Sequence, residues 1–186
     1  MIKILLFSLI AFVSCRNLGM VREFNFTFFY NELIFYHNLL REIHSVDNIT
    51  KDKDLENLAQ ISVDKCKTAG KLVNSDILYN GQKVGQHLFV SGGQPQRAGT
   101  IVHNWYKEFL NYDFNKGQPK INDLEVGHFT QIVWKATTKI GCAFAEGNWN
   151  DIYPSYYFSC IYFPKGNIPG EYAENVFKYK KITREK

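Results

Sequence analysis

The chain has 186 residues, with 22 basic and 18 acidic side chains, and its formal net charge of +4 is too small to indicate a nucleic-acid-binding protein. Hydrophobic residues make up 45% of the chain and aromatic residues 16%, which is enough for one hydrophobic core. The length is too short for two ordinary domains, so a single domain is expected.

The first element is an apolar run from Ile4 to Val13, preceded by one positive charge at Lys3. This run is too short to span a bilayer and is typical of the core of a secretory signal peptide. We expect cleavage after Cys15, so that residues 1–15 form the signal peptide and the mature protein is secreted and extracellular. Elsewhere the sequence has no hydrophobic run long enough for a transmembrane segment.

Secretion changes how the asparagines and cysteines are interpreted. Triplets that begin at Asn25 and Asn48 match the acceptor pattern for N-linked glycans, and both are expected to be surface glycosylation sites, although such triplets also occur by chance. Three cysteines remain once Cys15 is removed with the signal peptide. An odd number allows at most one intramolecular disulfide and leaves one thiol.

Apolar residues recur at helical spacing over 32–44 and again over 54–72, which predicts two helices. A third helix begins near Arg97. Its buried stripe is expected to contain Ile101, Trp105, Glu108, Phe109 and Tyr112. Because an unpaired buried charge is costly, Glu108 must be paired, protonated or facing a polar cavity. The alternative is a slightly rotated helix that leaves Glu108 at the rim.

The second half of the chain predicts a loop over 113–126, a short helix over 128–136, and strands over 141–145 and 156–163 joined by a turn. A weaker strand signal covers 85–90. The basic residues after 177 are expected to form a frayed, solvated tail, with contact to an anionic membrane surface as the alternative.

Four segments, in this order, resemble the CAP superfamily of cysteine-rich secretory proteins, insect antigen five and pathogenesis-related class-one proteins: 37–41, 105–108, 127–134 and 160–167. Ile161 departs from the pattern, which has a polar residue there. The resemblance covers nearly all of residues 16–186. It implies an α+β fold, a three-layer α-β-α sandwich with a central antiparallel sheet, of the kind found in short venom-allergen-like proteins. No cysteine follows Cys160, so the cysteine-rich module of some relatives is not expected.

The resemblance also implies that Cys142 pairs with Cys160, a bond that should contribute about 3 kcal/mol in the chain-entropy account. Cys66 lies where many relatives have a helix-two cysteine, but the expected partner near Gly147 is absent. We therefore expect a buried free thiol at Cys66, with intermolecular pairing as the alternative.

Family members commonly present two histidines and two glutamates in a central cavity that can hold a divalent cation. The matching positions are His128 and Glu108, which are retained, and Asn74 and Gln86, which are amides. Neutral amides are poor zinc ligands, so no cofactor and no tight metal binding are expected, beyond weak zinc binding through His128 and Glu108. His87 would help only if it faced the cavity, and strand alternation gives that side to Gln86 instead.

The alternative for His128 is a purely structural role, in which its ring only orients Glu108 inside the fold. His37, His44 and His103 lie in helix patterns without a partner motif, so they are expected to be structural or solvated.

Relatives bind sterols near the loop after the third helix and fatty acids between two helices. Here that loop is flanked or occupied by the aromatic side chains of Tyr106, Phe109, Tyr112 and Phe114. They predict binding of a sterol or a fatty-acid-like lipid, unless they simply cap the core.

The competing hypothesis is an extracellular protein that binds a host or receptor protein and has an inert cavity. Hydrolysis is a weaker third, because the sequence has no Gly-x-Ser-x-Gly or His-Glu-x-x-His motif and no nucleophile is identifiable beside His128. A non-enzymatic protein, monomeric or weakly dimeric, is expected.

Overall fold

The computed structural model describes residues 24–180, and the predicted signal peptide lies outside the described residues. The helices are α1 (Phe26–Ile43), α2 (Lys53–Ala69), α3 (Ala98–Tyr106), the 3-10 helix η1 (Lys107–Asn111), α4 (Gly127–Ile132) and α5 (Tyr172–Asn175). The strands are β1 (Thr50–Lys51), β2 (Leu78–Tyr79), β3 (Gln82–Lys83), β4 (Gly85–Gly92), β5 (Tyr112–Asp113), β6 (Gln118–Pro119), β7 (Lys139–Trp149) and β8 (Tyr153–Phe163).

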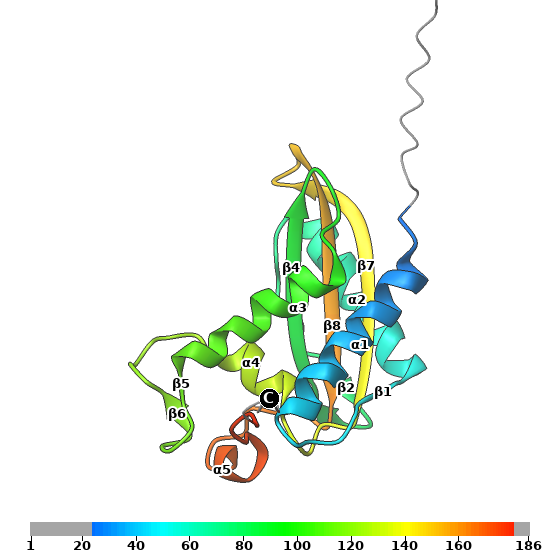
Figure 1. Cartoon of the computed structure of the whole chain (residues 1–186). Helices are drawn as coiled ribbons and strands as arrows, with labels where there is room; N and C mark the ends of the chain where they lie inside the picture. The colour runs from blue at the N-terminus through cyan, green and yellow to red at the C-terminus, as the bar shows by residue number, and fades with distance from the viewer. Residues whose placement is uncertain (1–23, 181–186) are drawn as a thin grey trace, which may run out of the picture.

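One sheet with the order β1-β7-β8-β4 forms the middle layer. The long strands β7, β8 and β4 are antiparallel, as predicted, whereas the two-residue β1 pairs with β7 in parallel and makes the sheet mixed. Helices α1, α3 and α4 lie on one face and α2 packs against β7 and β8 on the other (Figure 1). The three-layer α-β-α fold is therefore confirmed.

Strand alternation gives the protein a core on each face of the sheet. The core under α1, α3 and α4 is dominated by aromatic side chains, among them Phe29, Trp105, Phe129, Trp134 and Tyr162. The core under α2 is smaller and contains fewer aromatic residues, with Leu55, Ala59, Val63 and Cys66 on the helix and Tyr157 and Ile161 on the strand. Each helix therefore buries one apolar stripe against the sheet.

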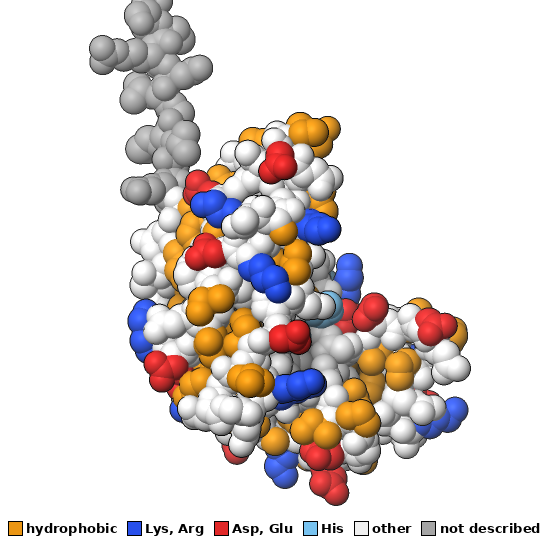
Figure 2. Space-filling model, turned by 180° about the vertical axis from the view of Figure 1, so that it is seen from behind, with side chains coloured by type: hydrophobic (Ala, Val, Ile, Leu, Met, Phe, Trp, Pro, Cys, Tyr) orange, Lys and Arg blue, Asp and Glu red, His pale blue; other side chains and the backbone are white. Residues whose placement is uncertain are grey.

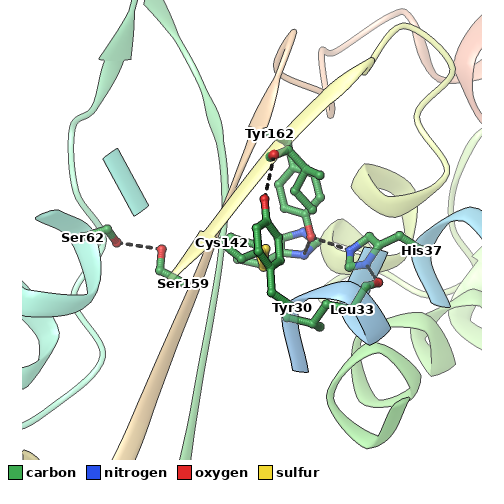
Figure 3. Close-up of a disulfide and its surroundings, with 10 residues drawn as sticks. Tyr30, Leu33, His37, Ser62, Cys142, Ser159 and Tyr162 are labelled. Carbon is green, nitrogen blue, oxygen red and sulfur yellow. Dashed lines mark hydrogen bonds between the residues drawn. A yellow bond between two sulfur atoms is a disulfide. The ribbon is translucent and has the colours of Figure 1, made fainter. Parts of the chain in front are cut away.

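Cys142 and Cys160 lie directly opposite each other on β7 and β8 and form a disulfide, as the resemblance implies. The bond faces the α1 side of the sheet, while Ser159 donates a 3.0 Å hydrogen bond to Ser62 on the α2 side (Figure 3). Cys66 is a buried free thiol, as expected, and its Sγ contacts the backbone of Val73.

Two predicted helices have different limits in the structure. The first begins at Phe26 rather than at residue 32, because the Asn25 side chain accepts a hydrogen bond from the backbone N–H of Phe28 and caps it. The third ends at Tyr106 and tightens into η1, so that Tyr112 lies in β5 instead of on a continuous helical stripe.

The backbone of the C-terminal segment is held against the end of α1 up to the last described residue, although the side chains of Lys178, Tyr179 and Lys180 are exposed as expected for a solvated segment. The N–H of Lys180 donates to the carbonyl of Ile43 at 2.8 Å, and the ring of Tyr179 lies 6.1 Å from that of His44. Packing against the end of α1 satisfies backbone groups that a free tail would leave to water.

Within residues 24–180, none of the helices is both long enough and apolar enough to cross a membrane. Figure 2 shows basic and acidic side chains interspersed on one face of the molecule, without a continuous basic patch there.

Candidate functional site

A cavity of about 380 Å³ lies at the β4 edge of the sheet, between that strand, the first turn of α4 and the segment after β8. The predicted residues Asn74, Gln86 and His128 all line it, and His87 lines it as well. Glu108 lies behind His128 and contacts it directly. The structure thus brings all four predicted cavity residues to one place.

Glu108 is paired, as the first of the sequence-based alternatives required. One carboxylate oxygen accepts from Nδ1 of His128 at 2.7 Å. The other accepts from the backbone N–H groups of His128 and Phe129 at 2.8 and 3.2 Å. These N–H groups belong to the first turn of α4, so Glu108 caps this helix from η1 and fixes the His128 ring.

The two amide positions are engaged within the protein or exposed. Gln86 accepts from the N–H of Ser75 at 3.0 Å and donates to Oγ of Ser62 at 2.5 Å, so both ends of its amide are used. Asn74 is exposed at the mouth of the cavity. With Glu108 also committed to three hydrogen bonds, the set of Asn74, Gln86, Glu108 and His128 does not fit a divalent cation.

His87 is the residue that the sequence-based interpretation misplaced. Its side chain is 3% exposed, and its ring centre lies 4.8 Å from that of His128 and 4.9 Å from that of Trp105. Gln86 and His87 do point to opposite faces of β4, but β4 is the edge strand, so a cavity at this edge contacts both faces. The sequence does place His87 directly after Gln86, the residue aligned with the family's strand glutamate. This position was the one sign that a second histidine could lie at the cavity.

A chain of hydrogen bonds leads from His87 into the core on the α1 side. Nδ1 of His87 lies 2.9 Å from the hydroxyl of Tyr162. Nε2 of His37 lies 2.9 Å from the same hydroxyl, and Nδ1 of His37 lies 2.7 Å from the carbonyl oxygen of Leu33 (Figure 3). Burial lowers the pKa of His37 to about 4 and holds the pKa of His87 well below its usual range, so both rings are neutral at pH 7.

This chain fixes which ring nitrogens carry protons. A carbonyl only accepts, so His37 donates through Nδ1 and its Nε2 accepts from the hydroxyl of Tyr162. The Tyr162 oxygen must then accept from Nδ1 of His87. Nε2 of His87 is left without a proton, and it is buried without a hydrogen-bond partner among the described residues.

The two signature segments are joined to each other beside the cavity. The hydroxyl of Thr130 donates to the side-chain oxygen of Asn167 at 2.6 Å, and the N–H of Gly166 donates to Gln131 at 2.9 Å. These bonds hold the first turns of α4 against the segment after β8. These four residues of the two signature segments therefore have a structural role.

Arg41 on α1 also holds this part of the chain in place. Its buried guanidinium donates to the carbonyl oxygens of Ile132, Trp134 and Thr137 at 2.9, 2.9 and 2.7 Å. Burial without a directly bonded carboxylate lowers its pKa to about 10. The first-helix motif thus positions the end of α4.

The four aromatic residues predicted to bind lipid all pack around Phe129. Tyr112 is almost completely buried, while Tyr106, Phe109 and Phe114 are partly buried. Between the start of η1 and the start of α4, the large apolar side chains that are exposed are instead Leu110, Ile121 and Leu124.

A second cavity of about 300 Å³ lies beside the aromatic residues, and Phe109, Leu110, Tyr112, Phe114 and Tyr179 are part of its wall. The hydroxyl of Tyr112 is buried and has no hydrogen-bond partner among residues 24–180. Lys120 and Lys178 lie at the same cavity and supply positive charge.

Both predicted glycan acceptors, Asn25 and Asn48, are exposed, as are the threonines two residues after each of them. His44 is buried between Phe177 and Tyr106, and His103 is exposed, so the expectation of structural or solvated roles holds for these two.

The comparisons with known proteins agree with this architecture. The family model described as "Cysteine-rich secretory protein family" matches residues 34–162. The chain belongs to this family. Protein PRY2 of Saccharomyces cerevisiae is 33% identical over 151 residues, which are 80% of this chain and 41% of PRY2. Cysteine-rich secretory protein 1 of Mus musculus is 31% identical over 144 residues, 75% of this chain and 57% of the mouse protein.

Solved structures show the same fold at lower identity. Venom allergen-like protein 4 of Schistosoma mansoni superposes with a TM-score of 0.60 at 20% identity, over 81% of this chain and 94% of that one. The crystal structure of NaASP2 with Zn2+ gives a TM-score of 0.55 at 19% identity, over 82% of this chain and 86% of that one. The chain aligns with less than half of the length of several sequence relatives, PRY2 included.

Proposed function

We propose that this family member is a secreted, extracellular protein that binds a sterol or a similar flat lipid at the cavity beside η1 and β5. The observation that carries the proposal is Tyr112, which lines this cavity together with Phe109 and Phe114 and whose hydroxyl is buried without a hydrogen-bond partner among the described residues. A sterol combines flat apolar rings with one hydroxyl group. Its rings would cover this wall, and a shift of the Tyr112 side chain towards the ligand would let the two hydroxyl groups pair, which an unsatisfied buried group favours.

Secretion is supported by two Candida albicans relatives whose names describe them as secreted proteins, at 30% and 32% identity. Glycosylation at Asn25 and Asn48 belongs to the same proposal. Asn25 caps α1 through its side-chain oxygen, which leaves the amide nitrogen that carries a glycan directed away from this bond.

A non-enzymatic role is supported by the chemistry of the β4-edge cavity. Its wall contains His87 and His128, but no serine, threonine or cysteine is among the described residues that line it. General-base histidines act on a nucleophile or a bound water that is positioned for attack, and donors that stabilise an oxyanion complete such a site.

The test compares sterol binding by wild type, Tyr112→Phe and Phe114→Ala in a fluorescent-sterol titration. Tyr112→Phe removes only the hydroxyl, so we expect a loss of about fivefold in affinity for a sterol, equivalent to about 1 kcal/mol, and no loss for an analogue without the hydroxyl. Phe114→Ala should weaken both ligands. Tyr153→Phe, at an exposed tyrosine at the start of β8, is the matched control.

Background-level sterol binding by the wild-type protein would overturn the proposal. The second candidate is binding of an extracellular host or receptor protein. The β5–β6 hairpin projects from the rest of the fold (Figure 1). The exposed apolar side chains of Leu110, Ile121 and Leu124, which flank this hairpin in the sequence, favour such binding. A pull-down from extracellular fluid, with Ile121→Asp as the comparison, would test that alternative.

A further inference from the structure

The strand β4 has a free edge, because it is the last strand of the sheet and pairs with β8 alone (Figure 1). Gly93, one residue beyond the strand, donates its N–H to the carbonyl of Pro154 at 2.8 Å and continues the register of β4 with β8. Backbone groups of successive residues point to alternate sides of a strand, so the odd-numbered residues bond to β8. Gln86, Leu88 and Val90 therefore direct their backbone N–H and C=O groups away from the sheet.

The disulfide leads to the same assignment. The Cα atoms of Cys142 and Cys160 are 4.1 Å apart, close to the spacing of about 4.5 Å in an antiparallel pair whose two residues do not exchange hydrogen bonds. The backbone groups of Cys160 therefore point away from β7 and towards β4, where its partner is His87. His87 thus bonds to β8, and its neighbours in the sequence face outwards.

The free edge of β4 is open to a further strand. Among residues 24–180, no hydrogen bond from another segment reaches the backbone of Gln86, Leu88 or Val90. The strand reads Gly-Gln-His-Leu-Phe-Val-Ser-Gly, without the charged residues or prolines that commonly protect an edge from pairing. A row of outward backbone groups of this kind can pair with an extended chain.

Two buried polar atoms without partners lie beside this edge. Nε2 of His87, whose side chain is 3% exposed, lies at the β4-edge cavity. Oγ of Ser75 lies at an adjoining cavity of about 640 Å³, here called the Ser75 cavity, which Gln86 also lines. Asn74 and Lys165 line both cavities, so the two are contiguous along the edge. Because an unpaired buried polar atom is costly, both atoms favour a ligand that hydrogen-bonds to them.

We propose that β4 binds an extended peptide segment of a partner protein, which adds a strand at this edge and places side chains in the two cavities. Its backbone pairs with the outward groups of Gln86, Leu88 and Val90. Its side chains alternate between the two faces of the sheet, so that some lie next to His87 and others next to Ser75.

The tautomer of His87 restricts which side chain the β4-edge cavity accepts. Nε2 of His87 has no proton, since Nδ1 donates to the hydroxyl of Tyr162. The peptide side chain that meets Nε2 must therefore donate a hydrogen bond. Serine, threonine, asparagine and glutamine supply such a donor without bringing a charge into the cavity.

The test begins with a phage-displayed library of random peptides of about eight residues, within the usual length of a strand, selected on the secreted, glycosylated protein. A selected peptide is labelled with fluorescein and titrated by fluorescence polarisation. Methylation of its backbone nitrogens, one at a time, should weaken binding about tenfold at every second residue and have little effect at the residues between, because only alternate N–H groups face β4. A library without a binder, or an N-methyl series without this alternation, would overturn the proposal.

Hydrogen exchange gives a measurement that needs no variant. In the free protein the backbone N–H groups of Leu88 and Val90 should exchange faster than those of His87 and Phe89, which bond to β8. Addition of the selected peptide should slow the exchange of Leu88 and Val90 about tenfold. Unchanged exchange at these two residues would place the peptide elsewhere. A wild-type dimer that the peptide dissociates would make a second copy of the chain, and not a partner peptide, the occupant of the edge.

The role of His87 is tested separately. His87→Asn keeps an amide near the position of Nδ1 and removes Nε2. It should lower the affinity about fivefold for a peptide with its hydroxyl or amide side chain at the matching position, and leave unchanged the affinity for the same peptide with alanine there. His103→Asn, at an exposed histidine of α3, is the matched control. Equal losses for both peptides would contradict the contact with His87. Sterol binding is measured at another cavity, so either proposal can fail alone.

Discussion

Glu108 is expected to stabilise the folded state through the three hydrogen bonds that its carboxylate accepts, and Glu108→Ala removes all three at once. Loss of a helix cap costs about 1 kcal/mol, and each further hydrogen bond to a charged group contributes about 1.5–3 kcal/mol. Allowing for water that enters the space, we expect the free energy of unfolding to fall by about 3–4 kcal/mol. Glu108→Gln keeps one acceptor oxygen and should cost about half as much.

The assay is guanidinium unfolding followed by tryptophan fluorescence, with the slope compared between variants so that a change of midpoint reports stability. Glu125→Ala is the control, because Glu125 lines the same cavity but is exposed. Its effect should stay within about 0.5 kcal/mol. If Glu108→Ala were as stable as Glu125→Ala, the role assigned to Glu108 in holding α4 would be wrong.

Two further predictions concern buried side chains. The pKa of His37 is about 4 in the folded protein and about 6.5 when unfolded, so the unfolded chain binds more protons at acidic pH. The contribution of His37 to stability, about 3 kcal/mol, is therefore complete above about pH 6.5 and is lost as the pH falls towards 4. Unfolding midpoints from pH 7 to 4.5 should decline accordingly, and an NMR titration of His37 with a midpoint near 6.5 would contradict this. Cys66 should resist a thiol reagent in native protein and react with one equivalent in denaturant, because its Sγ is buried under α2. Rapid labelling of the native protein would show that α2 opens or that the thiol is accessible.

The fold was predictable because its strongest signals are local. Helical spacing identified α2 to within three residues, and the two signature segments located α4, β8 and the disulfide. The helix limits were predicted less accurately than the helix positions. The start of α1 was missed because it depends on the cap formed by Asn25 and on the burial of Phe29 and Tyr30 against the sheet.

The sequence predicted which residues lie at the cavity but not how their side chains are arranged. The alternation rule correctly sends Gln86 and His87 to opposite faces, yet it says nothing about whether a strand lies in the middle or at the edge of its sheet. That property depends on the pairing of β4 with β8 alone, which is a tertiary fact. The hydrogen bonds that leave Nε2 of His87 free involve Leu33, His37 and Tyr162, from a distant helix and a neighbouring strand.

Glu108 connects the two cavities through successive residues of α4. His128 lines the β4-edge cavity, Phe129 lies at the centre of the aromatic residues beside the second cavity, and Glu108 accepts the backbone N–H of both. Glu108→Gln should therefore lower the sterol affinity of the second cavity although Glu108 does not line it, whereas Glu125→Ala should leave that affinity unchanged. The fluorescent-sterol titration measures both variants. An unchanged sterol affinity in Glu108→Gln would mean that α4 keeps its position without the carboxylate.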